Sequence, residues 1–272
     1  MLALFSAVLW GFAAFSGGQA ARRSHLFSVM VLDQTLAPLL SIPFGLFLAD
    51  QFLIRDFLIG GASGLAGSIA VAFFYLGLRS NMAAVAPITG VVTAILPVLW
   101  GISRGEYLAP LQIFGVVLGL VSIFLVSGSQ WGKMNLQLDA IINGVLAGAG
   151  FGLAYIILDS TNPSTAPWPV VGARVVPAIL ILLVAKKAPW PAIPSSRARP
   201  FIAGAVLADV LAAVLFLAAL NRGLLSVSSV LSSLHPAITV LLARFFLRER
   251  ISVTQGAGLF AAVAAVSMIT IG

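Results

Sequence analysis

The chain has 272 residues, of which 60% are hydrophobic and 8% are charged, and its formal net charge is +7. A mean hydropathy of +1.10 is too high for a soluble core to hide the apolar side chains, so the composition predicts an integral membrane protein with no room for a soluble domain. The cations lie between apolar runs, where they contact lipid headgroups, so we expect no nucleic-acid partner. The absence of cysteine excludes disulfide and thiol chemistry.

Apolar runs of about 20 residues, the length that crosses a bilayer as a helix, follow one another along the chain. The first run ends in small residues, Ser16 to Ala20, that resemble a signal cleavage site, but we expect a retained helix because a later stretch resembles this run. Prolines prevent a continuous helix in the longest connector, 186–200. The ten runs are 2–18, 26–49, 57–78, 82–102, 111–127, 138–158, 167–185, 201–220, 225–247 and 253–271.

The second half of the chain repeats the first. Shifted by 141 residues, SAVLWGFAA (6–14) aligns with AGAGFGLAY (147–155), and shifts of 142 to 143 align LGLRSNMAAVA with LAALNRGLLSVSS and GEYLAPLQIFG with RERISVTQGAG. Each half holds five runs, an odd number, so the second half enters the membrane upside down. The sequence therefore predicts an all-α membrane protein of ten transmembrane helices in two inverted five-helix repeats, 1–133 and 134–272, with a substrate site near the midplane.

A polar stripe runs along the ninth apolar segment. Ser228, Ser232, His235 and Thr239 are spaced by four, three and four residues, which places them on one face of a helix. We expect this face to line a cavity, with His235 as a gate, a proton carrier or a hydrogen-bond partner of the substrate. Alternatively, the hydroxyls bond their own preceding carbonyls, and the histidine, beside Pro236, is a packing residue.

Asp209 lies in the middle of the apolar string AVLADVLAAVLFLAAL. A carboxylate in hydrocarbon costs at least about 2.5–3.5 kcal/mol, so it must face a cavity, face a partner or be protonated. We expect Asp209 to bind and release a proton during transport, or to neutralise a substrate amine. The alternative is a structural hydrogen bond to a neighbouring helix.

Asp33 and Arg174 occupy equivalent positions of the two repeats at the same shift of 141. Opposite charges at paired positions suit a zwitterion such as an amino acid, with Asp33 engaging the ammonium and the planar donor fork of Arg174 engaging the carboxylate. Alternatively, each charge reaches a membrane interface or pairs locally. Gln34 shares both interpretations.

Aromatic and small residues complete the predicted site and its packing. Trp10, Tyr75, Trp100 and Tyr155 can line a cavity for apolar or cationic ligands, although an interfacial belt suits Trp100 better. Small residues every four positions, in 60–68 and in 144–152, predict close helix packing. The predicted substrate-binding residues are Trp10, Asp33, Gln34, Tyr75, Thr89, Tyr155, Arg174, Ser228, Ser232, His235 and Thr239, with Asp209 for proton coupling.

The Trp-Gly pair in VLWGF, the string SSLHPAITVLLARFFLRERISVTQGAGL and the five-plus-five arrangement resemble the EamA-type transporters of the drug/metabolite transporter superfamily. The resemblance covers essentially the whole chain. It implies an exporter of amino acids, other small metabolites or drugs, whose central cavity is lined by the first four helices of each half. The fifth helices lie outside, which suits runs 111–127 and 253–271 because they carry no ionisable residue.

We therefore expect a secondary transporter that exports amino acids or related amphiphiles by alternating access, driven by the proton gradient or by facilitated flow. A cationic-drug exporter and a lipid-linked-sugar flippase are the alternatives within transport. An intramembrane serine protease is the alternative of another class, because GASG around Ser63 resembles the serine motif of rhomboid proteases, with His235 as its partner. The glycine-rich packing segment and the duplicated halves favour a transporter rather than an enzyme.

The remaining expectations concern partners and location. No HExxH, GxxxxGK[ST] or ligand cluster occurs, so we expect no metal and no cofactor, only a small-molecule substrate and the bilayer, in a monomer or homodimer. The expected location is a bacterial inner membrane, crossed many times. The resemblance implies cytoplasmic termini, whereas the lysines and arginines gather on the opposite side and the positive-inside rule favours the reverse orientation. We retain the orientation that the resemblance implies, and the disagreement stays open.

Overall fold

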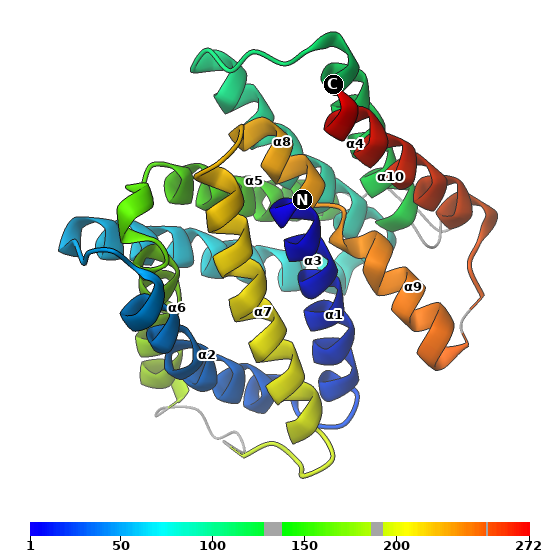
Figure 1. Cartoon of the computed structure of the whole chain (residues 1–272). Helices are drawn as coiled ribbons and strands as arrows, with labels where there is room; N and C mark the ends of the chain where they lie inside the picture. Colours follow the sequence, from blue (N-terminus) through cyan, green and yellow to red (C-terminus); the bar gives the residue numbers. More distant parts are fainter. Residues whose placement is uncertain (128–137, 186–192, 249) are drawn as a thin grey trace.

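The computed structural model describes residues 1–127, 138–185, 193–248 and 250–272, and the regular structure in these ranges is helical. The predicted boundary between the repeats, at 133/134, lies outside the described residues. Figure 1 shows the helices, which in chain order are α1 (Leu2–Ala21), α2 (Leu26–Leu48), α3 (Ile54–Ser103), α4 (Pro110–Ser127), α5 (Leu138–Asp159), the 3-10 turn η2 (Pro163–Thr165), α6 (Trp168–Ala185), α7 (Arg199–Leu220), α8 (Leu225–Ser232), α9 (His235–Leu247) and α10 (Val253–Ile271).

Nine segments of the described chain are long and apolar enough to cross a bilayer, and α6 adds a shorter one, Trp168–Leu183. Two of the nine, Ile54–Phe74 and Val85–Ser103, come from α3, and α8 with α9 forms another. Large apolar side chains point outward, such as Phe47, which is 82% exposed, and lipid is the medium that can cover such a surface. The chain is thus a multi-pass integral membrane protein, as its composition predicts.

Helix α3 turns back on itself although its helical hydrogen bonding continues for 50 residues. Gly150 and Gly148, neighbours on α5, lie against Ala70 and Val92 of α3, respectively. In a straight helix Ala70 and Val92 would be about 33 Å apart, so the two parts of α3 must run side by side along α5. The two apolar runs predicted in this part of the chain are therefore two crossings of the membrane.

The ninth apolar run is interrupted, which corrects the expectation of one continuous helix. Helix α8 ends at Ser232 and α9 begins at His235. Pro236 has no N–H to offer the carbonyl of Ser232, so the helical hydrogen bond between these two residues is missing at the break. The imidazole Nδ1 of His235 lies 3.3 Å from that carbonyl and donates to it instead.

Small residues bring helices into direct backbone contact, as their spacing predicts. A Cβ atom on Gly60 or Gly64 of α3 would overlap the backbone of Pro169 or Ala173 of α6, respectively. The glycines of α5 pack closely on the second part of α3, with Gly144 against Ile88, Gly148 against Val92 and Gly152 against Leu96. The prediction of close packing at both stretches is confirmed.

Helices α4 and α10 pack against each other at one edge of the bundle, as Figure 1 shows, and neither carries an ionisable residue. Helix α1 lies against α7 and α9. This arrangement leaves the helices with intramembrane charges, α2, α6 and α7, on the other side of the molecule from α4 and α10. The peripheral place expected for the fifth and tenth membrane crossings agrees with this arrangement.

The bundle has two chemically different ends. The terminal end holds both chain termini and the connections that follow α2, α3, α5 and α7. The basic end holds the connections that follow α1, α6 and α9, with Arg22, Arg23, Arg197, Arg199, Arg244, Arg248 and Arg250 among its described residues. Acidic side chains gather at the terminal end, where the described residues include Asp50, Asp56, Glu106 and Asp159.

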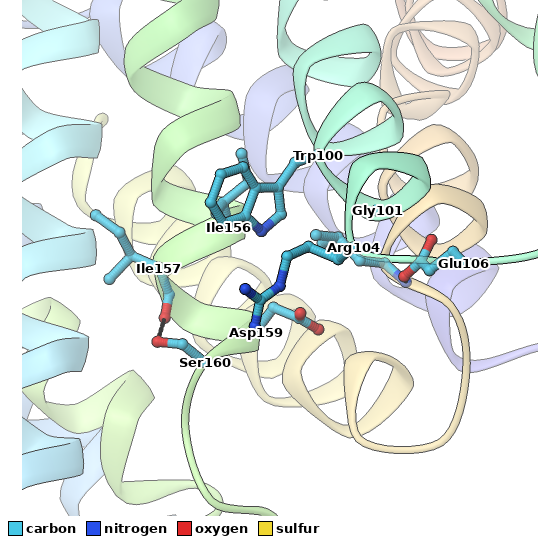
Figure 2. A pocket seen from close by; sticks show the side chains of 9 residues that line it. Trp100, Gly101, Arg104, Glu106, Ile156, Ile157, Asp159 and Ser160 are labelled. Atoms are coloured by element: carbon cyan, nitrogen blue, oxygen red, sulfur yellow. Dashed lines mark hydrogen bonds between the residues drawn. The ribbon is translucent and has the colours of Figure 1, made fainter.

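A cavity of about 420 Å³ opens at the terminal end, between the C-terminal ends of α3 and α5 and the start of α8 (Figure 2). Glu106 forms one wall, and its carboxylate accepts hydrogen bonds from the backbone N–H groups of Leu225 at 2.7 Å and Ser226 at 3.0 Å. These bonds satisfy donors that the first turn of α8 would otherwise leave unpaired.

Candidate functional site

The candidate site is organised around Asp209, the eleventh of the 22 residues of α7. This position is about 15 Å from either end of the helix and thus near the middle of a hydrocarbon layer of about 30 Å. Its neighbours Ala208 and Val210 are buried, whereas the Asp209 side chain is 31% exposed. A partly exposed carboxylate at this depth is a functional candidate by its position alone.

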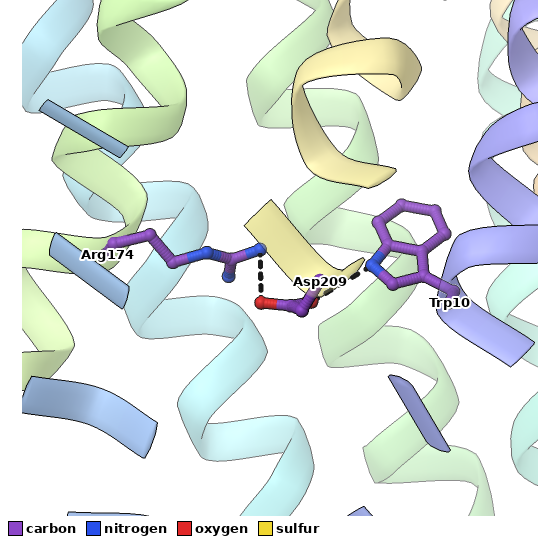
Figure 3. Close-up of polar contacts among 3 residues, drawn as sticks. All are labelled: Trp10, Arg174 and Asp209. Atoms are coloured by element: carbon purple, nitrogen blue, oxygen red, sulfur yellow. Dashed lines mark hydrogen bonds and ion pairs between the residues drawn. The ribbon is translucent and has the colours of Figure 1, made fainter. Parts of the chain in front are cut away.

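Two helices hold the Asp209 carboxylate from opposite sides, as Figure 3 shows. Nη2 of Arg174, on α6, lies 2.9 Å from Oδ2, and the indole Nε1 of Trp10, on α1, donates to Oδ1 at 3.0 Å. The ion pair offsets the charge that either group would carry alone into the membrane. Nε of Arg174 is buried and has no hydrogen-bond partner among the described residues, so the guanidinium retains donor capacity.

Asp33, on α2, completes the charged part of the site, because it lies close enough to interact electrostatically with both Asp209 and Arg174. The structure therefore brings together the two positions that the repeat pairs in sequence. It also adds a partner that the sequence reasoning did not assign, since Arg174 is already engaged by Asp209. Two carboxylates and one guanidinium give this cluster a formal charge of −1.

Aromatic side chains form the apolar wall beside the charges. The rings of Trp10 and Tyr155 stack at 5.9 Å between centroids with an interplanar angle of 10°. Phe216 lies 4.4 Å from Tyr155 and 5.4 Å from Trp10, and it is 1% exposed. Sequence reasoning missed Phe216, although it follows Asp209 by two helical turns and so lies on the same face of α7. The side chain of Tyr75 lies outside the described residues.

Of the polar stripe, His235 is the member that the structure places beside the aromatic wall, 6.5 Å from Trp10 between ring centroids. The hydroxyl of Ser232 bonds that of Ser6 at 2.7 Å and the carbonyl of Ala3 at 3.2 Å, while Thr239 donates to Gly11 at 3.1 Å. These hydroxyls tie α8 and α9 to α1. Ser228, also on the stripe, is 4% exposed.

The other predicted residues lie in helix contacts. Thr89 donates to the carbonyl of Gly144 at 3.2 Å and so joins α3 to α5. Gln34 is half-buried next to Asp33, and Trp100 is 45% exposed at the terminal end. Ser63, the serine of the protease-like motif, donates to the carbonyl of Ala154 at 2.8 Å, which commits its hydroxyl to helix packing.

Apolar side chains separate the Asp209 cluster from the terminal end. We call this group the apolar plug; its buried members include Leu158, Phe216, Leu217, Leu220 and Leu225. They come from α5, α7 and α8, at positions that follow Tyr155 and Asp209 toward the terminal end. The plug therefore lies between the site and the cavity of Figure 2.

Glu106 is a second residue that sequence reasoning did not assign. Its signal was present, because the alignment of GEYLAPLQIFG with RERISVTQGAG sets Glu106 opposite Glu249 in the repeat. Within the described part of the chain, no group of three or more His, Cys, Asp or Glu side chains could hold a metal ion.

Comparison with known proteins bears on the family and the fold. The model of the EamA-like transporter family matches residues 138–271. No curated protein matches the sequence. Similar folds occur in 29 solved chains; one of them, a crystal structure, aligns with a TM-score of 0.79 over 99% of this chain and 95% of its own, at 16% identity, which shows the fold alone. Residues 138–271 thus match the EamA-like transporter family, and the helical membrane fold of the chain is that expected of an EamA-type transporter.

Proposed function

We propose that the chain is a secondary transporter that exports a small zwitterionic metabolite, an amino acid or a related amphiphile, by alternating access. The observation that carries this proposal is the Asp209 cluster at half depth in the bundle, where charge, donor capacity and an aromatic wall meet. Intramembrane ionisable groups with such partners mark substrate or ion pathways. The expected location remains a bacterial inner membrane, which rests on the family resemblance.

The cluster offers complementary groups for a zwitterion. Arg174 has five N–H donors, of which the Asp209 carboxylate engages Nη2, so others can take a substrate carboxylate. Asp33 can take the ammonium. An apolar side chain would then lie against the stacked rings of Trp10 and Tyr155.

The charge of −1 on the cluster suggests how export is driven. A proton and a substrate ammonium can each neutralise the excess carboxylate charge of Asp33 and Asp209. Once one of them is bound, the cluster no longer attracts the other electrostatically. Such competition couples the outward movement of substrate to the inward movement of a proton. Asp209 is the proposed proton-coupling residue.

The two halves, 1–133 and 134–272, form the proposed inverted repeat that moves around this site. Helix contacts support this, because they are preserved when counterparts in the halves are exchanged. Helix α1 of the first half packs on α7, and its counterpart α5 packs on the first part of α3, which is the counterpart of α7. Helix α1 also packs on α8 and α9, and α5 likewise packs on their counterpart, the second part of α3. The last helices of the two halves, α4 and α10, pack on each other.

Transport by purified protein in proteoliposomes tests the proposal. A labelled panel of amino acids and organic cations is supplied with and without an imposed pH gradient, to wild type, to Asp209→Asn and to the matched control Asp139→Asn, whose carboxylate is exposed at the start of α5. We expect wild type and Asp139→Asn to move a zwitterion faster with the gradient. Asp209→Asn should lose the response to the gradient.

Other outcomes discriminate among the alternatives. A wild type that moves solute but ignores the gradient would be a facilitator. Movement of organic cations instead of amino acids would favour the cationic-drug exporter, and failure of the whole panel would direct the search to lipid-linked sugars. The family match points to a transporter rather than an enzyme, and a serine-directed fluorophosphonate that labelled Ser63 would argue against it.

A further inference from the structure

The cavity at the terminal end, here called the vestibule, is lined by other residues than those of the Asp209 cluster. It encloses about 420 Å³ between α3, α5 and α8, which falls within the range of small-molecule sites. Figure 2 shows side chains of both charge signs directed into it, together with an indole ring. The apolar plug separates it from the Asp209 cluster.

Two of the vestibule's charged groups are uncommitted. Within the described chain, the guanidinium of Arg104 and the carboxylate of Asp159 have no hydrogen-bond or ion-pair partner, although both line the same cavity. The Glu106 carboxylate, in contrast, is engaged by the backbone N–H groups of Leu225 and Ser226. The free groups are therefore one cation and one anion.

Apolar side chains form another part of the vestibule wall. The guanidinium carbon of Arg104 lies 5.9 Å from the centroid of the Trp100 ring, which orients the cation without neutralising it. Ile156 and Ile157 of α5 line the wall beside Asp159. A ligand with two opposite charges and an apolar portion would find a partner for each part.

We propose that the vestibule is a second ligand site, for a molecule that carries an ammonium and an anionic group beside an apolar portion. Asp159 binds the ammonium and Arg104 binds the anionic group, a carboxylate or a phosphate, through its planar donor fork. Two sources share this chemistry. One is a free amino acid, and the other is the headgroup of phosphatidylethanolamine, which lies at the depth of these helix ends.

For a free amino acid, this proposal rests on the proposed function and makes the vestibule a station on the transport route. Asp159 follows Tyr155 by about 6 Å along α5, so the two sites are close. The plug lies between them, and Leu225, 1% exposed, belongs to the plug while its backbone N–H is held by Glu106. The route between the sites opens when these side chains move.

The chain has no cysteine, so a single introduced cysteine is its only thiol, and slower labelling of that thiol reports a bound ligand. Ser160→Cys places a thiol in the vestibule, and Tyr107→Cys places one at an 81% exposed site outside its wall. The full chain in phosphatidylcholine/phosphatidylglycerol nanodiscs reacts with a methanethiosulfonate reagent, with or without L-phenylalanine. We expect L-phenylalanine to slow labelling at Ser160→Cys and not at Tyr107→Cys, whereas phenethylamine and phenylpropionate, each lacking one charge, should not protect.

Second substitutions assign the protection to the vestibule. Adding Arg104→Gln or Asp159→Asn should weaken protection about ten-fold, the loss typical of one charge-assisted hydrogen bond. Adding Asp209→Asn should leave it intact. If the lipid is the occupant, labelling will already be slow in nanodiscs that contain phosphatidylethanolamine, and L-phenylalanine will slow it no further.

The outcomes separate this proposal from the proposed function. Protection that depends on Asp209 but not on Arg104 or Asp159 would overturn the vestibule site and leave the transport proposal standing. If protection depends on Arg104 and Asp159 but the protein moves none of the zwitterions, the vestibule site stands and the transport proposal is overturned. Equal labelling under every condition, or equal slowing at Tyr107→Cys, would overturn the vestibule site.

Discussion

Placing Asp209 or Arg174 alone at the depth of the hydrocarbon layer costs free energy, and pairing the two opposite charges offsets part of that cost. Their side chains are 31% and 22% exposed, so the pair is neither fully solvated nor fully buried. An ion pair in such a place adds little stability relative to apolar residues, but breaking it leaves a charge without its partner. The pair is therefore better explained by a role in the site than by the stability of the fold.

A double-mutant cycle measures this coupling. Asp209→Asn should lower the free energy of unfolding by about 1–3 kcal/mol, because Arg174 loses its counter-charge. Asp209→Asn combined with Arg174→Gln should lower it by clearly less than the sum of the two single changes. The measurement is denaturant unfolding in detergent micelles, and strictly additive effects would contradict the ion pair.

At the scale of helices, one proline shapes the region beside the site. Pro236 cannot donate to the Ser232 carbonyl, and His235 supplies the missing hydrogen bond at 3.3 Å. The same imidazole lies at the edge of Trp10. The break between α8 and α9 thus fixes a titratable ring next to the Asp209 cluster, which is where broken membrane helices place polar groups in transporters.

The contact between α3 and α6 depends on glycine. In Gly60→Ala the new Cβ would overlap the carbonyl of Pro169, so the helices must separate and the free energy of unfolding should fall by about 1–3 kcal/mol. Gly67→Ala, on the same helix, meets nothing within 4 Å and should leave stability unchanged or raise it by up to about 1 kcal/mol. Thermal unfolding in one detergent compares the two, and equal losses would contradict packing as the cause.

At the scale of the whole molecule, the ends differ in charge. Arginines predominate at the basic end, whereas the carboxylates of the terminal end lie beside only three arginines among the described residues, Arg55, Arg104 and Arg222. Because of this asymmetry, the family resemblance and the positive-inside rule predict opposite orientations in the membrane. The family orientation, with cytoplasmic termini, places the basic end outside, whereas the positive-inside rule places it in the cytoplasm. The positive-inside rule applies to short loops, and the loops at both ends of this bundle are short.

Single cysteines in the cysteine-free chain test the orientation. An impermeant maleimide added to intact cells should label Ser196→Cys, at the basic end, and should label Tyr107→Cys, at the terminal end, only after permeabilisation. Both side chains are exposed, so access and not burial decides the result. The reverse pattern would show that loop charge prevails, and labelling of both from outside would contradict the alternation of ends.

The sequence by itself determined the membrane class, the crossings and the close-packed glycine stretches. Hydropathy over about 20 residues and small residues at every fourth position are local properties, and they act before any distant helix is placed. The repeat alignment also placed Asp33 and Arg174 at related positions, which the structure brings into one cluster.

Only the tertiary structure decided which distant groups meet. Trp10 and Arg174 reach Asp209 from α1 and α6, and Glu106 reaches the start of α8 from beyond α3. Such contacts depend on how each helix is rotated and crossed against its neighbours, because a change of one residue in register turns a side chain by about 100°. The apolar faces of these helices are too alike for hydropathy to select that rotation, so the Asp209 cluster and the vestibule exist only once the bundle is packed.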